Sequence, residues 1–145
     1  MAYSDEGRRF WHIDLTTRAG ARGAAAQGGS ACFVFCAMAV LGAVVFGGLS
    51  GLTTPEGIVA ASGAGLEALI ALVAGLRLRE GKGAYWGMAA AALAALELIG
   101  KVLTISIGGF LIVGAILIMI IQGIRGALAL KNQPRFEDDD LDVFA

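Results

Sequence analysis

Charged side chains are scarce in this chain. Only 16% of its 145 residues are Asp, Glu, Lys or Arg, whereas 57% are hydrophobic. A soluble domain carries charge on roughly a quarter of its residues, so the composition disfavours a soluble globular fold. The net charge of −1 also disfavours general affinity for nucleic acid, which favours a basic protein surface. We therefore expect no nucleic-acid partner.

Residue types that ligate metals or perform catalysis are also few. The single histidine, His12, precedes the first apolar run, so no span can ligate haem or chlorophyll through an imidazole. Cys32 and Cys36 lie about one helical turn apart. We interpret them as small apolar packing residues, with a metal or redox pair as the alternative. Without a zinc-type cluster, phosphate loop or serine-triad motif, we expect no cofactor, no metal site and no catalytic residue.

Long apolar runs, by contrast, dominate the chain. A transmembrane helix needs about 20 mostly apolar residues, and four segments qualify. They lie at about 31–52, 56–76, 84–104 and 107–130. Thr54 can cap the second segment, and Pro55 suits its first helical position. The pattern predicts an all-α integral membrane protein with a four-transmembrane-helix antiparallel bundle.

The remaining segments are two tails and short connections. Residues 31–130 form the expected transmembrane domain, with an amino-terminal tail at 1–30 and an acidic carboxy-terminal tail at 131–145. Within the first tail, 19–29 reads as a flexible small-residue linker. The turn at 106–109 is so short that the last two helices must form a hairpin.

The distribution of basic residues predicts membrane topology. Lys and Arg favour the cytoplasmic side, and they are concentrated in the amino-terminal tail, in the middle loop and at the carboxy-terminal end. These residues are Arg8, Arg9, Arg18, Arg22, Arg77, Arg79, Lys82, Arg125, Lys131 and Arg135. We therefore expect a multi-pass protein of a bacterial inner membrane with both termini cytoplasmic.

Small residues recur at steps of four in the first three spans, where they allow close helix packing. They are Ala39, Ala43, Gly47, Gly51, Gly57, Ala61, Gly65, Gly87, Ala91 and Ala95. The fourth span is bulky from Phe110 to Ile121. We expect helices one to three to pack tightly, with helix four against one side. The alternative is that one small-residue stripe serves oligomerisation or docking.

Three ionisable residues lie inside the apolar runs: Glu67, Glu97 and Lys101. Glu97 and Lys101 are four apart in the order that favours a helical ion pair, and we expect them to neutralise each other near the outer face. Glu67 has no basic residue within a turn and is expected near the bilayer midplane. An unpaired carboxyl at that depth is a candidate functional residue.

The tails carry two further candidate surfaces. Basic and aromatic residues near the amino terminus suit a lipid headgroup region, as an interfacial anchor or a short extended arm. These residues are Arg8, Arg9, Phe10 and Trp11. Phe136 and Phe144 flank the terminal acids and suit docking to a basic partner surface. A simple solvated tail is the alternative.

Two functional hypotheses follow. The first is a small accessory or assembly protein without catalysis, which lies in the lipid bilayer and associates with a larger membrane complex or with itself. The alternative is a small dimeric ion- or proton-coupled transporter or channel that uses Glu67, Glu97 and Lys101.

Overall fold

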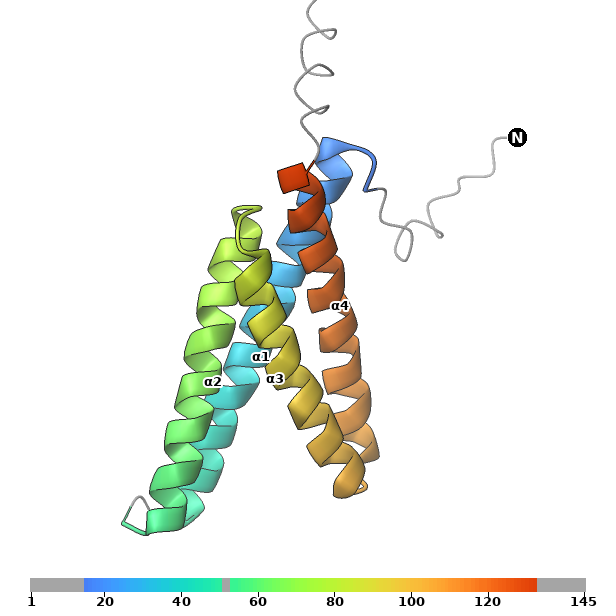
Figure 1. The fold of residues 1–145 in the computed structure, drawn as a ribbon. Helices are drawn as coiled ribbons and strands as arrows, with labels where there is room; N and C mark the ends of the chain where they lie inside the picture. The colour runs from blue at the N-terminus through green and yellow to red at the C-terminus, as the bar shows by residue number, and fades with distance from the viewer. Residues whose placement is uncertain (1–14, 51–52, 133–145) are drawn as a thin grey trace, which may run out of the picture.

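The computed structural model describes residues 15–50 and 53–132, which form four α-helices (Figure 1). The helices are α1 (Arg18–Ser50), α2 (Pro55–Arg79), α3 (Ala84–Leu103) and α4 (Ile107–Asn132). No residue in these two ranges lies in a β-strand. Each helix contains a stretch long and apolar enough to cross a membrane. The predicted all-α class and the four membrane-length helices are therefore confirmed.

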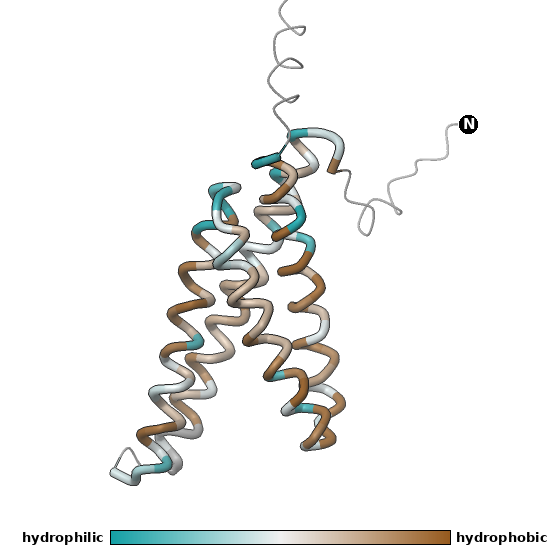
Figure 2. Tube along the Cα trace, in the orientation of Figure 1, coloured by the Kyte–Doolittle hydropathy of each residue, from teal (hydrophilic) through white to brown (hydrophobic). Residues whose placement is uncertain are grey.

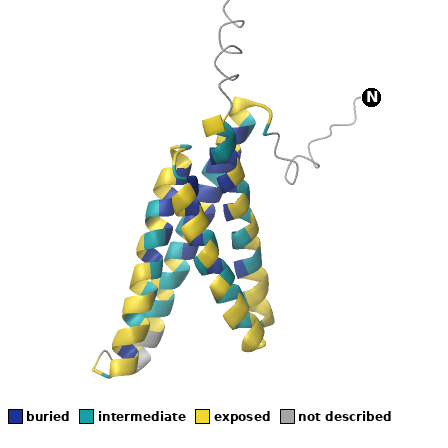
Figure 3. Ribbon diagram, viewed as in Figure 1, coloured by how far each residue is buried: buried dark blue, intermediate teal, exposed yellow. Residues whose placement is uncertain are grey.

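The helices form two hairpins that meet at one end and diverge toward the other (Figure 1). α1 packs along α2 and crosses α4, and α3 packs mainly on α4. We call the end with Arg18, loop 80–83 and Asn132 the basic end. The opposite end, with the turns at 53–54 and 104–106, is the turn end. Hydrophilic residues gather at the basic end (Figure 2), and buried residues lie mainly in the half of the molecule near it (Figure 3).

The start of α1 differs from the prediction. The helix begins at Arg18 rather than near residue 31, so 19–29 is helical and the predicted flexible linker is wrong. The Thr17 hydroxyl accepts a hydrogen bond from the Gly20 backbone N–H at 3.1 Å, as N-cap residues do. At ~1.5 Å per residue, the helix extends about 50 Å. It therefore continues well beyond a ~30 Å hydrocarbon core.

Packing against α4 explains why this Ala- and Gly-rich segment is helical. A Cβ added to Gly28 would lie 2.5 Å from the Gly123 Cα, and one added to Gly126 would lie 2.8 Å from the Ala24 Cβ. Side chains of any size would separate the two backbones, and small residues are what allow helices in lipid to approach this closely. We call the contact between Gly28 and Gly123 the glycine crossing.

The position of α4 also corrects the sequence-based expectation. α4 is not an outer helix beside a tight unit of three, because it crosses α1 at the basic end while α1 and α3 make few contacts. One stripe of α4 is buried, with members at helical spacing. The stripe contains Val113, Ile116, Ile120, Ile124 and Ala127. Because this helix is bulky on all sides, its composition does not reveal that one stripe is buried and that only the faces away from this stripe are exposed.

Phe35 is the largest fully buried side chain and belongs to a core cluster shared by all four helices. Cys32, one turn before it, is completely buried in the same cluster, and Cys36 packs against it. Both cysteines are free thiols. These positions support the interpretation of the pair as packing residues.

The connections between helices have specific hydrogen bonds. The Thr54 hydroxyl accepts from the Gly57 N–H at 3.1 Å, and Pro55 is the first residue of α2, so the predicted helix start is confirmed. After α2, the Lys82 N–H donates to the Arg77 carbonyl at 3.0 Å while Gly81 has a φ of 70°. This pattern is a Schellman motif, in which glycine avoids the steric cost of a positive φ.

Candidate functional site

The small residues predicted to pack helices have different environments. Gly57 and Gly87 are buried, whereas Gly65 is exposed and an added Cβ there would meet nothing within 4 Å. The alanines of the stripes are half-buried. They are Ala39, Ala43, Ala61, Ala91 and Ala95. Gly51 and the surroundings of Gly47 lie outside the described residues. The tightest contact, the glycine crossing, uses residues that the stripes do not include.

Glu97 and Lys101 form the ion pair that their spacing predicts. The Lys101 Nζ lies 3.6 Å from the Glu97 Oε1, and the two side chains are 36% and 31% exposed. Both residues lie on α3 in its turn-end half. The pair therefore neutralises much of its own charge while each side chain keeps about a third of its surface free for another contact.

Glu67 lies at the same level of the molecule as this pair. Counted from loop 80–83, which joins α2 to α3, Glu67 and Glu97 are nearly equally distant. Glu67 precedes the last residue of α2, Arg79, by twelve positions, and Glu97 follows the first residue of α3, Ala84, by thirteen. At ~1.5 Å per residue, both carboxyls are about 18–20 Å from the connecting loop. Consistently, Glu67 has electrostatic interactions with Glu97, which repels it, and with Lys101, which attracts it.

Glu67, Glu97 and Lys101 therefore lie at one level of the molecule, and we call them the charge cluster. The sequence-based depths were counted from the outer ends of helices whose lengths differ. Counting from the shared loop instead places Glu67 and Glu97 at nearly equal distances from it, although α2 and α3 diverge away from this loop (Figure 1).

The chemistry open to the charge cluster follows from its composition and exposure. No salt bridge or hydrogen bond joins Glu67 to another described residue, and no charged residue is fully buried in the described ranges. Two carboxylates beside one ammonium can hold a cation or exchange a proton. They can also accept hydrogen bonds from polar groups of another helix. A charge at membrane depth requires a partner or water, because lipid solvates it poorly.

The remaining predicted residues of the two tails cannot be placed in this geometry. The amino-terminal anchor and the carboxy-terminal docking residues lie outside the described residues. They are Arg8, Arg9, Phe10, Trp11, Phe136 and Phe144. Among the residues that are described, no group of three or more His, Cys, Asp or Glu side chains is arranged to hold a metal ion.

The chain matches no protein-family model, no curated protein and no solved structure.

Proposed function

We propose that this chain is a small integral membrane accessory or assembly protein that binds a larger membrane complex or a second copy of itself. The observation that carries the proposal is the divergence of the hairpins at the turn end. Small residues on the separated helices have open space beside them: an added Cβ at Gly42, Gly63 or Gly65 would meet nothing within 4 Å. Small-residue surfaces are where transmembrane helices pack most closely.

The charge cluster supports the same proposal. Glu67, Glu97 and Lys101 are only partly covered by their own chain, and exposure of such groups to hydrocarbon costs about 2.5–3.5 kcal/mol each at the centre of a helix on insertion scales. A partner helix seated at the turn end would exclude lipid from these side chains and offer them polar contacts. Association would therefore stabilise both the partner and this chain.

The proposed topology places the basic end at the cytoplasmic face of a bacterial inner membrane. Basic residues favour that face, and exposed aromatic residues favour the membrane–water boundary. Tyr85 and Trp86 are exposed at the start of α3, next to loop 80–83 at the basic end. With both termini on this side, the two tails would be available to cytoplasmic parts of a partner complex.

Purification of the full chain in mild detergent tests the proposal. We expect it to elute as an oligomer or with a co-purifying membrane protein, and Gly65→Leu to weaken that association about tenfold or more, because the larger side chain prevents close helix approach. Gly23→Leu is the matched control, since Gly23 also has nothing within 4 Å but lies near the basic end. Elution of the wild-type protein as a lone monomer would contradict the proposal.

The grouping of the three charges favours a second candidate, a small dimeric ion- or proton-coupled transporter or channel. Here Glu67 would exchange the proton or bind the cation, while the charges of Lys101 and Glu97 would determine the protonation state of Glu67. Flux through liposomes containing the protein distinguishes this candidate. A flux that Glu67→Gln leaves unchanged would remove Glu67 from any transport role.

A further inference from the structure

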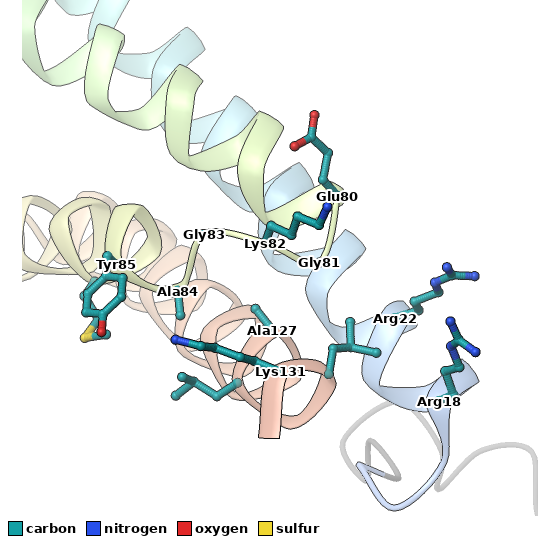
Figure 4. Close-up of a pocket in the computed structure, with 13 residues that line it drawn as sticks. Arg18, Arg22, Glu80, Gly81, Lys82, Gly83, Ala84, Tyr85, Ala127 and Lys131 are labelled. Carbon is teal, nitrogen blue, oxygen red and sulfur yellow. The ribbon is translucent and has the colours of Figure 1, made fainter. Parts of the chain in front are cut away.

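A pocket of about 870 Å³ lies at the basic end, between the first turns of α1, loop 80–83, the start of α3 and the end of α4 (Figure 4). Four basic residues and one acidic residue line it. These are Arg18, Arg22, Lys82, Lys131 and Glu80. Four positive charges and one negative charge leave a formal charge of +3. Because the basic side chains come from three separate elements, the positive charge depends on the fold and not on one run of sequence.

The rest of the pocket wall is apolar. Met88 from α3 and Leu128 from α4 contribute to it, and Tyr85 lies beside Lys131, whose Nζ is 5.7 Å from the centre of the tyrosine ring. This distance is within the range of a cation–π interaction, which holds the ammonium over the ring. The wall therefore combines hydrogen-bond donors for an anion with a surface for hydrocarbon.

The place of the pocket indicates the source of that anion. The exposed Tyr85 and Trp86 mark the membrane–water boundary near the start of α3. A pocket at this level is open to lipid headgroups, and basic pockets between transmembrane helices are typical sites for anionic headgroups. An apolar wall beside basic groups suits a ligand that carries hydrocarbon next to its phosphate.

We propose that the basic end binds the phosphate group of an anionic phospholipid. The positive charge around the pocket attracts the phosphate group, and Arg22 or Lys82 donates hydrogen bonds to the phosphate oxygens. Figure 4 shows the ammonium group of Lys131 turned toward Tyr85 and away from Arg18 and Arg22. The upper part of an acyl chain lies along Met88 and Leu128. This site is separate from the charge cluster and from the turn end, so the lipid site can be tested independently of the proposed function.

Native mass spectrometry of the full chain in detergent tests the site with phosphatidylglycerol and phosphatidylcholine as probes. We expect selective retention of phosphatidylglycerol, and about 25-fold weaker binding for the variant Arg22→Gln/Lys82→Gln, since each basic residue near an anionic headgroup contributes about fivefold. Arg77→Gln/Arg125→Gln removes the same charge from exposed positions that do not line the pocket, and it should retain the lipid. Equal retention of both lipids, or equal losses in both variants, would overturn the proposal.

Two further measurements identify the group that binds in the pocket. Excess inorganic phosphate should fail to displace the lipid, and full displacement would instead make a soluble phosphate the ligand. The variant Asp138→Asn/Asp139→Asn/Asp140→Asn neutralises acids of the carboxy-terminal tail, which follows α4 in the sequence. We expect it to bind phosphatidylglycerol no more tightly than the wild type. Binding seen only in this variant would assign the pocket to the acidic tail and overturn the lipid proposal.

Discussion

Gly123→Ala is expected to destabilise the protein by about 2 kcal/mol. The added Cβ would lie 2.6 Å from the Gly28 Cα, and that neighbour is backbone, so the clash cannot be relieved by a side-chain rotation. Overpacking of a close contact typically costs about 1–3 kcal/mol. Gly28→Ala should have a similar effect, because its Cβ would meet the Gly123 Cα from the opposite side. Thermal or denaturant unfolding in detergent micelles measures both variants.

Matched glycines on the same two helices provide the controls. An added Cβ at Gly42 of α1 would meet nothing within 4 Å, and one at Gly114 of α4 would lie 3.9 Å from the Leu98 Cδ1, an ordinary contact distance. Gly→Ala at these positions should be neutral or stabilising by up to about 1 kcal/mol, because alanine favours a helix interior over glycine. Equal losses of stability at all four positions would contradict the close contact between Gly28 and Gly123.

Lys101→Gln is expected to destabilise the protein by about 1–2 kcal/mol. The substitution leaves Glu67 and Glu97 at the same level of the molecule without the cation that attracts both. Removing one partner of an ion pair leaves an uncompensated charge. Exposure of about a third of each side chain reduces this cost below the value for a buried pair. The measurement is unfolding in detergent, with Arg125→Gln, an exposed position at the basic end, as the control.

A second substitution makes this prediction specific to the charge cluster. Glu67→Gln in the Lys101→Gln background should restore at least half of the lost stability, because it removes the repulsion between the two carboxylates. Residues in contact show such non-additivity, whereas distant residues do not. Strictly additive effects of the two substitutions would mean that Glu67 is not coupled to Glu97 and Lys101.

Most helix positions follow from the sequence. The expected segments 56–76, 84–104 and 107–130 lie within three residues of α2, α3 and α4 at every end, because apolar length and turn residues are local signals. The start of α1 was not predictable in this way. Residues 19–29 are rich in Ala and Gly, which suit either a linker or a helix. Their contact with Gly123 and Gly126, which are distant in the sequence, favours the helix.

The charge cluster was partly predictable. Spacing alone gives the pair of Glu97 with Lys101, since both lie on one helix. The level of Glu67 relative to this pair depends on how α2 and α3 run from loop 80–83, and a residue count from that loop provides it. The divergence of the hairpins is different, because it results from which small residues on α1 and α4 make contact. That choice depends on tertiary packing and leaves no periodic signal in the chain.

The central claim is that the two hairpins cross closely at the basic end and diverge at the turn end. Distances between paired spin labels on the full chain test it most directly, with labels carried by unnatural residues so that Cys32 and Cys36 stay in place. One pair, at Ile58 and Leu111, joins α2 to α4 near the turn end, and the other pair, at Arg77 and Arg125, joins them near the basic end. All four positions are exposed. The account predicts a clearly longer distance for the turn-end pair, and equal distances, as in a parallel-sided bundle, would contradict it.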